Sequence, residues 1–271
     1  MGILEGQNRL NMWFDNLTIK NLPKTFLFCG DLGCGKHTLA KAVADKLNLK
    51  LQDITENFSK DLIIDLSYTN IPTLYLVDLS VLKKDDQNIL LKWTEEPNDA
   101  TFICLLSDSY HRVLPTILNR CIKYEFEQYS QDILKRYIDS EISPENSFLA
   151  LKVFSTIGQI KMFRSQNLVG LKKLCDGLIT LMEKANLQNA LSVSNRFNYS
   201  DEYDKYDVEL FFRMLAQSGV ELSIQDTDKY LKYYKIINKY WSQLSNNPKL
   251  NKQYIIDGLL VSLWKESRGL L

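Results

Sequence analysis

Few residues in this sequence are of the kinds that mark repetitive or cross-linked proteins. Only 11 of its 271 residues are glycine, 6 are proline and 5 are cysteine, and no biased tract gathers them. This composition excludes collagen-like and intrinsically disordered chains. The cysteines are odd in number and show no C-x-x-C spacing, which argues against a disulfide framework and a zinc site. We therefore expect free thiols in a reducing compartment.

An excess of charge of either sign is lacking as well. The 33 basic and 33 acidic residues balance, so no overall field draws the chain toward nucleic acid or anionic lipid, and any DNA contact has to be local. No apolar run approaches the roughly 18 residues of a membrane span, and the opening MGILEGQNRL lacks the apolar core of a signal peptide. We therefore expect a cytoplasmic protein with no membrane association.

Two kinds of apolar pattern divide the chain near residue 130. Before that point, short β-rich runs alternate with amphipathic helical segments, which is typical of a parallel sheet with crossover helices. The runs are Phe26–Cys29, Leu74–Val77, Thr101–Leu106 and Ile122–Phe126. Beyond Tyr129, apolar residues recur every three or four positions, as from Leu168 to Leu181. The sequence therefore predicts an α/β part followed by an all-helical part.

A glycine-rich segment is the strongest local motif. Residues 30–38 read GDLGCGKHT, in which four residues separate Gly30 from Gly35 and Lys36. The spacing alone is a weak signal, but here an apolar run precedes it and an amphipathic helical pattern follows it. In that context the backbone N–H groups around Gly33 converge on one point, and Lys36 neutralises the outer phosphates. We predict a phosphate-binding loop for ATP; the alternative is an ordinary strand-to-helix turn with a surface lysine.

The position after the lysine departs from the usual pattern of such loops. It should carry a hydroxyl for Mg²⁺, but it is His37, and the hydroxyl of Thr38 comes one place later. Mg²⁺ prefers oxygen ligands, so a neutral imidazole is a poor replacement. Thr38 and Asp78 are the residues that would hold Mg²⁺, and the alternative for His37 is a helix-start residue without a metal role.

The predicted strand Leu74–Val77 is followed by Asp78 and then Leu79. A carboxylate at the C-terminal edge of a parallel strand suits the metal side of a nucleotide site. Proteins that hydrolyse nucleotides at such a site normally have a glutamate next, which positions or deprotonates the attacking water. Because leucine cannot accept a proton, the general base is missing unless another residue supplies it.

Further motifs carry a resemblance to a known family. They are Asn88–Pro97 (NILLKWTEEP), Thr101–Ile103 (TFI) and Leu114–Cys121 (LPTILNRC). Together with the glycine-rich loop, they make residues 5–160 resemble the AAA+ clamp-loader family, and within it the delta-prime branch. The resemblance implies an AAA+ P-loop core at 1–129, a helical lid at 130–165 and a helical collar at 166–271 that joins loader subunits in a ring. The four-cysteine zinc module common in bacterial loaders is absent, which suggests a phage or mobile-element version without zinc.

The resemblance also implies roles for single residues. Arg120 would be a finger that reaches the nucleotide of a neighbouring subunit, a role that suits its planar, always-charged guanidinium. The alternative is a salt-bridging arginine at a strand start. Ser107 would be the first sensor. The second sensor is an arginine in the family, but this chain has Gly158 in its place, which argues against hydrolysis in cis.

A basic stretch near the C-terminus has two interpretations. No acidic residue occurs from Tyr230 to Ile256, where lysines alternate with aromatic residues. Such a pattern can hold nucleic acid through phosphates and stacking. More often it is an amphipathic helix with buried aromatics and solvated lysines.

Two functions remain open. The first is a stator-like, delta-prime-type clamp-loader subunit in DNA replication, favoured by His37, Leu79 and Gly158. It would bind ATP weakly or without hydrolysis and act with other loader subunits, a sliding clamp and primer-template DNA, so that ATPase activity belongs to the assembled complex. The second is an active AAA+ P-loop ATPase such as a helicase loader, favoured by the retained Lys36 and Asp78.

Overall fold

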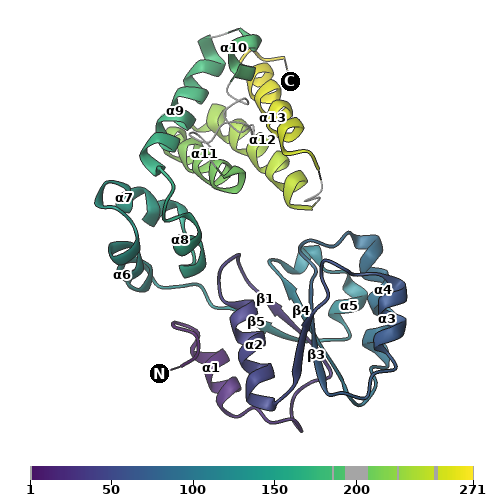
Figure 1. The fold of residues 1–271 in the computed structure, drawn as a ribbon. Coiled ribbons are helices and arrows are strands. Elements are labelled where there is room, and N and C mark those ends of the chain that lie inside the picture. Colours follow the sequence, from purple (N-terminus) through teal and green to yellow (C-terminus); the bar gives the residue numbers. More distant parts are fainter. Residues whose placement is uncertain (1, 185, 193–206, 225, 247–249, 271) are drawn as a thin grey trace. The chain divides into compact units, whose positions relative to one another are not determined.

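The computed structural model describes residues 2–184, 186–192, 207–224, 226–246 and 250–270. Its internal contacts divide the chain into two compact units (Figure 1). The first comprises Met1–Ile133 together with Ser155–Gln159, and the second comprises Leu134–Phe154 together with Ile160–Leu271. The boundaries expected at residues 129 and 165 remain predictions.

The first unit is built on a parallel sheet of five strands in the order β2-β3-β4-β1-β5 (Figure 1). The strands are β1 (Thr25–Cys29), β2 (Lys50–Asp53), β3 (Thr73–Asp78), β4 (Thr101–Ser107) and β5 (Ile122–Glu125). The predicted α/β fold is therefore confirmed, and four of these strands coincide with the apolar runs of the sequence. β2 was not predicted, because Leu51 is the only apolar residue among its four.

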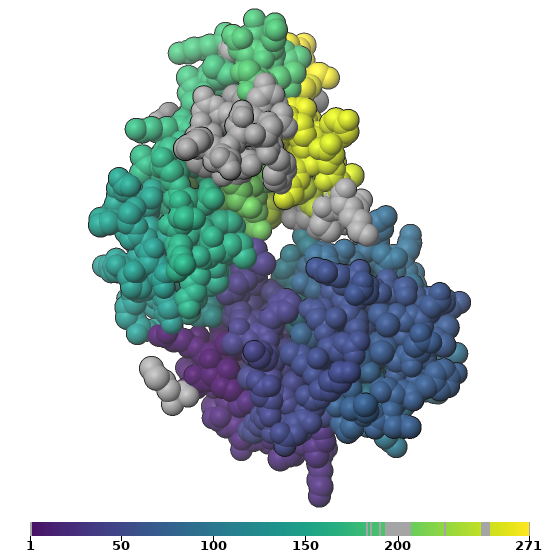
Figure 2. All heavy atoms as spheres, viewed as in Figure 1, coloured from purple at the N-terminus to yellow at the C-terminus, as the bar shows by residue number. Residues whose placement is uncertain are grey.

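Helices cover both faces of this sheet. One face packs against α1 (Asn8–Asp15) and α2 (Lys36–Leu47), and the other packs against α3 (Lys60–Leu66), α4 (Lys84–Glu95) and α5 (Pro115–Leu118). Alternate residues of β1 enter the two cores, Phe26 and Phe28 on the α2 side and Leu27 on the α4 side. A strand buried on both faces reads as an unbroken apolar run, which is why the sequence predicted it. The space-filling view shows the outer surface of this unit in purple to blue (Figure 2).

The carboxyl ends of three strands meet at one edge of the sheet. In the strand register Cys29 pairs with Ser107, and Asp78 pairs with Leu106. The chain passes from β1 directly into the glycine-rich loop Gly30–Gly35, called the P-loop below, and then into α2. This topology puts the P-loop, Asp78 and Ser107 at the edge where α/β sheets bind their ligands.

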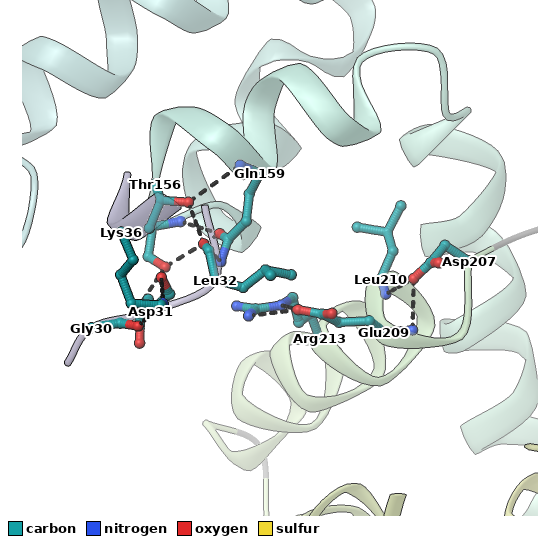
Figure 3. Close-up of polar contacts among 11 residues, drawn as sticks. Gly30, Asp31, Leu32, Lys36, Thr156, Gln159, Asp207, Glu209, Leu210 and Arg213 are labelled. Atoms are coloured by element: carbon teal, nitrogen blue, oxygen red, sulfur yellow. Dashed lines mark hydrogen bonds and ion pairs between the residues drawn. The ribbon is translucent and has the colours of Figure 1, made fainter. Parts of the chain in front are cut away.

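The second unit is helical throughout the residues that the structure describes, as predicted. After α6 (Gln131–Glu141), its helices are α7 (Pro144–Val153), α8 (Ile157–Phe163), α9 (Leu168–Lys184), α10 (Leu187–Leu191), α11 (Val208–Ser223), α12 (Thr227–Asn246) and α13 (Lys252–Glu266). Leu171 of α9, Phe211 of α11 and Leu259 of α13 are fully buried. The Asp207 carboxylate caps α11 by accepting hydrogen bonds from the backbone of Glu209 and Leu210 at 2.8 and 3.1 Å (Figure 3).

The basic stretch from Tyr230 to Ile256, interpreted above either as a nucleic-acid-binding segment or as an amphipathic helix, corresponds to α12 and the start of α13. Tyr233 and Ile237 are buried, whereas Lys232 and Lys235 are exposed. Lys232 forms an ion pair with Glu266 at 3.0 Å. The described part of the stretch is therefore an amphipathic helix; Lys249 lies outside the described residues. None of the described helices has the length and hydropathy that crossing a bilayer requires.

Candidate nucleotide site

The P-loop has a backbone conformation that depends on its glycines. Gly33 has φ +78° and Gly35 has φ +108°, in the left-handed region that side chains other than glycine rarely adopt. Gly35 is also the N-cap of α2, so the unpaired N–H groups of the first helical turn lie next to the loop. Gly30 fixes the other end of the loop by donating its N–H to the Ser107 carbonyl at 3.1 Å. Gly33 and Gly35 are thus needed for the backbone conformation of the loop. The start of α2 favours an anion.

Lys36 is buried beside the P-loop and does not lie on the surface. Its side chain is only 7% exposed, and its ammonium group donates to the carbonyl oxygens of Gly30 and, at 3.0 Å, Asp31 (Figure 3). The Cys34 thiol lies 3.8 Å from the same nitrogen. Burial raises the pKa of Cys34, and the nearby Lys36 charge opposes that rise. A turn with a surface lysine does not fit this arrangement, in which the ammonium group satisfies loop carbonyls until an anion replaces them.

His37, which stands where a metal-binding hydroxyl is expected, and Thr38, which carries the hydroxyl, lie on the first turn of α2. His37 and Thr38 are both exposed. The described residues contain no cluster of three His, Cys, Asp or Glu side chains that could hold a metal ion. Mg²⁺ usually keeps several waters and binds through one or two carboxylates plus substrate phosphates, so Thr38 and Asp78 fit that mode without a preformed cage. Their metal role stays a prediction.

Asp78 and Leu79 at the end of β3 point to different sides of the sheet. Asp78 follows Leu76 by two residues on the α2 side, and its carboxylate accepts a hydrogen bond from the Ser80 backbone at 2.8 Å. Leu79 is 1% exposed and belongs to the core that contains Trp93 on the opposite side. The position that would carry a catalytic glutamate is therefore a packing position in this chain.

Ser107 is buried at the end of β4 and its hydroxyl is used within a turn. The hydroxyl donates to the Ser109 carbonyl at 2.8 Å and accepts from the Ser109 backbone N–H at 3.3 Å. The hydroxyl of the proposed sensor therefore has no donor left for a phosphate oxygen unless this turn opens. Its sensor role stays a prediction.

Asp108, the next residue, was not singled out from the sequence. Its carboxylate forms an ion pair with Arg112 at 3.1 Å, and its backbone N–H donates to the Ser80 hydroxyl at 3.1 Å. Burial raises the pKa of Asp108; the charges of Arg112 and Lys36 oppose the rise and that of Asp78 adds to it. Lys36, Asp78 and Asp108 thus share one electrostatic environment. An acidic residue directly after an apolar run was the available signal.

A cavity of about 250 Å³ opens beside the P-loop. Gly30 and Cys34 line it from the loop, and the carboxylate residues Asp31, Asp108 and Glu125 also line it. Neither Lys36 nor Asp78 is among its lining residues, and carboxylates in the lining repel a polyphosphate. The arrangement is compatible with weak nucleotide binding.

Arg120 follows α5 and is held within its own chain. One guanidinium nitrogen donates to the Thr116 carbonyl at 2.8 Å, and another forms an ion pair with Glu95 of α4. The Arg120 side chain is 34% exposed and that of Glu95 is 47% exposed. A pair this exposed contributes about 0–1 kcal/mol, so it can be exchanged for another anion at little cost. Both the structural and the finger interpretation of Arg120 are compatible with this geometry.

Comparisons with known proteins find similar chains among DNA polymerase III subunits. A family model described as DNA polymerase III, delta subunit, matches residues 49–130. DNA polymerase III subunit gamma of Buchnera aphidicola is 25% identical over 181 residues, which cover 54% of this chain and 48% of that protein. DNA polymerase III subunit delta' of Bacillus subtilis is 26% identical over 137 residues, which cover 48% of this chain and 40% of that protein. The resemblance to clamp-loader AAA+ proteins is confirmed.

The match to these clamp-loader proteins has clear limits. The chain spans about half or less of the length of the relatives it matches. The region of the family model includes Asp78 and Arg120 but not the P-loop. A solved structure of a gamma subunit-related protein from Thermotoga maritima covers 96% of this chain and 99% of its own, with a TM-score of 0.52 at 16% identity. That likeness concerns the fold, and it extends over both units.

Proposed function

We propose that this chain is a delta-prime-like clamp-loader subunit of DNA replication that binds ATP weakly or without hydrolysis. The burial of Leu79 in the core carries the proposal, because it leaves no carboxylate at the position after Asp78, where the water-activating glutamate would stand. The names of the relatives, both subunits of DNA polymerase III, support the replication role. The partners would be other loader subunits in a hetero-oligomeric ring, a sliding clamp and primer-template DNA.

The expected loss of activity follows from the missing groups. General acid–base catalysis contributes about 10²–10⁴ in rate, and an arginine finger contributes about 10³–10⁵. This chain lacks the usual base after Asp78, and the isolated chain has no neighbouring subunit to supply a finger to its own site. Turnover by the isolated chain should therefore be close to undetectable.

Steady-state ATP hydrolysis by the purified chain, with Mg²⁺ and primed DNA present, tests the proposal. Lys36→Ala serves as the control for contaminating ATPases, because Lys36 is the residue that would neutralise the phosphates. No difference between the two proteins is expected. Hydrolysis of even about one ATP per minute that disappears in Lys36→Ala would show that the chain is an ATPase in its own right.

Arg120 would act on the site of a neighbouring subunit. Its ion pair with the exposed Glu95 is weak enough to be replaced by a phosphate. In a reconstituted loader, Arg120→Ala should leave nucleotide binding by this chain unchanged and lower the ATPase of the complex about 10³-fold at the neighbour's site. Unchanged activity of the complex would leave Arg120 as a structural residue.

The second function, an active AAA+ ATPase such as a helicase loader, has one observation in its favour. Asp108 shares its environment with Lys36 and Asp78, and burial raises its pKa, as expected of a residue that takes a proton. If the chain hydrolyses ATP, Asp108→Asn should abolish the activity while nucleotide binding persists. Activity retained in Asp108→Asn would exclude Asp108 as the base.

A further inference from the structure

Five residues from the C-terminal side of the chain lie directly on the P-loop. Ser155–Gln159 belong to the same compact unit as the P-loop, although the segments on either side, Leu134–Phe154 and Ile160 onward, belong to the other unit. The contact joins positions more than 120 residues apart in the sequence. It includes Gly158, the residue in the place of the sensor arginine.

The polar side chains of this segment cap a helix and also donate hydrogen bonds to the P-loop. Thr156 accepts the Gln159 backbone N–H at 3.2 Å, and the Gln159 side-chain oxygen accepts the Ser155 backbone N–H at 2.9 Å. This resembles a capping box at the start of α8, except that Gln159 accepts from Ser155, one residue before the N-cap Thr156. The Thr156 hydroxyl and the Gln159 amide nitrogen then both donate to the carbonyl of Leu32, at 2.7 and 3.2 Å (Figure 3).

The backbones of the two segments also touch. The Gly158 N–H donates to the Gly33 carbonyl at 3.0 Å. A Cβ atom added to Gly158 would lie 2.5 Å from that carbonyl oxygen, and one added to Gly33 would lie 2.8 Å from the Gly158 Cα. Neither position has room for a side chain, so the absence of the sensor arginine is a requirement of this contact.

We propose that Ser155–Gln159 form a clasp that holds the P-loop in one conformation without nucleotide. The clasp pairs the carbonyls of Leu32 and Gly33 with N–H and O–H donors, and the Ser155 hydroxyl adds a hydrogen bond to the Asp31 carboxylate at 3.0 Å. On the other side of the loop, the Tyr129 hydroxyl donates to the Cys34 carbonyl at 3.0 Å. A loop fixed at consecutive residues needs no bound phosphate to order it.

The clasp goes beyond the proposed function, because it determines how the loop is ordered whether or not ATP is hydrolysed. A nucleotide-free P-loop without such a partner would open readily, since a loop with few buried contacts lies at the low end of local stability. With the clasp in place, opening requires the loss of three or more hydrogen bonds at once. Each hydrogen bond lost changes an opening equilibrium by about two- to tenfold.

The chain contains its own reporter of loop opening. Cys34 lies within the P-loop and is 3% exposed, so a thiol reagent reaches it only when the loop opens. Cys104 in β4 and Cys175 in α9 are fully buried and report opening of the sheet and of the helices. Labelling of the nucleotide-free full chain with N-ethylmaleimide, followed by mass spectrometry of each cysteine peptide, measures all three rates together.

Two variants weaken the clasp in different ways. Thr156→Val keeps the side-chain volume but removes both the cap and the bond to Leu32, so Cys34 should be labelled about tenfold faster. Gly158→Ala adds the clashing Cβ and should have the same or a larger effect. Gly177→Ala is the matched control, because Gly177 lies in α9 with no atom near its added Cβ, and it should leave the labelling rate of Cys34 unchanged.

The result that supports the clasp is faster labelling of Cys34 in both variants with Cys104 and Cys175 unchanged. Labelling of Cys34 at the wild-type rate in both variants would overturn it. If Gly158→Ala accelerates all three cysteines, that variant has lost its global fold, and Thr156→Val decides alone: selective exposure of Cys34 supports the clasp, and any other outcome rejects it.

Discussion

The P-loop and the end of β3 lie at the same edge of one sheet, yet they differ in what they keep. The P-loop retains its glycines and Lys36, all of which a nucleotide site needs. The end of β3 retains Asp78 but has Leu79 packed in the core beside it. Under the proposed function, this chain has the residues for binding without the residue that would activate water.

The comparison also changes how the retained motif is interpreted. Lys36 bonds to the loop's own carbonyls, and Gly33 is required by its contact with Gly158. Both residues therefore have structural reasons to be present even if no nucleotide binds. Retention of the motif is weaker support for nucleotide use than the sequence alone suggests.

The largest expected effect is at the end of β3. Leu79→Glu, which would restore the usual acidic pair in sequence, should lower the free energy of unfolding by about 3–5 kcal/mol, because it buries a carboxylate without a partner in an apolar core. Urea denaturation measures this, and Leu79→Met, at about 1 kcal/mol, is the matched control. Equal losses in the two variants would mean that position 79 is not a packing position.

A smaller loss is expected in the P-loop. Gly33→Ala combines a left-handed backbone with a clash against the clasp and should lower the free energy of unfolding by about 2–3 kcal/mol. Gly269 has a similar φ of +65° but no atom within 4 Å of an added Cβ. Gly269→Ala therefore isolates the backbone strain. If thermal denaturation shows the same loss in both variants, the clasp contact contributes nothing.

The next effect in size is expected at Glu221, a carboxylate of the helical unit whose pKa is lowered by two lysines. Burial tends to raise the pKa of Glu221, but hydrogen bonds from Lys152 and Lys172 outweigh it and lower the pKa from 4.5 to about 2. Because the folded pKa is depressed, the stabilisation is present above pH 4.5 and is lost as the pH falls toward 2. With partial solvent screening we expect about 1–2 kcal/mol.

Urea denaturation at pH 6 and at pH 2.5 measures that contribution. The loss between the two pH values should be smaller by about the same 1–2 kcal/mol in Glu221→Gln than in the wild type. An identical pH dependence in the two proteins would contradict the assignment of the shift to Glu221.

The smallest expected effect has the opposite sign. The folded pKa of Asp108 is raised by burial, so its ionised form destabilises the fold as the pH rises through the raised value. Asp108→Asn should therefore raise the free energy of unfolding by about 0.5 kcal/mol at pH 7. The gain should disappear at about pH 3, where the wild-type carboxyl is protonated in both states. A variant less stable than the wild type at pH 7 would indicate that the pair with Arg112 dominates.

The hydrophobic pattern of the sequence predicted the elements whose side chains are mostly buried. The interiors of β1, β3 and β4 are apolar because both faces of the sheet are covered, and α9 has the period of a helix with one buried face. β2 has no such pattern, because an edge strand with exposed side chains is held mainly by its backbone bonds to β3.

The candidate site was predictable only to the extent that it is continuous in sequence. The P-loop and Asp78 each follow a recognisable strand, so their positions could be inferred. The burial of Lys36, the use of the Ser107 hydroxyl within its turn and the role of Asp108 depend on which strand ends meet. The clasp depends on a contact across more than 120 residues, and Gly158 by itself resembles a simple loss of arginine.

The contact of two glycines in the clasp has an evolutionary consequence. Neither Gly33 nor Gly158 has room for a Cβ while the two segments stay in contact. An arginine at residue 158 is therefore incompatible with the clasp. The segment would first have to detach, and each intermediate would have lost its cap bonds before it gained a nucleotide contact. Positions 33 and 158 are thus constrained together, whereas the exposed His37 carries no such steric constraint.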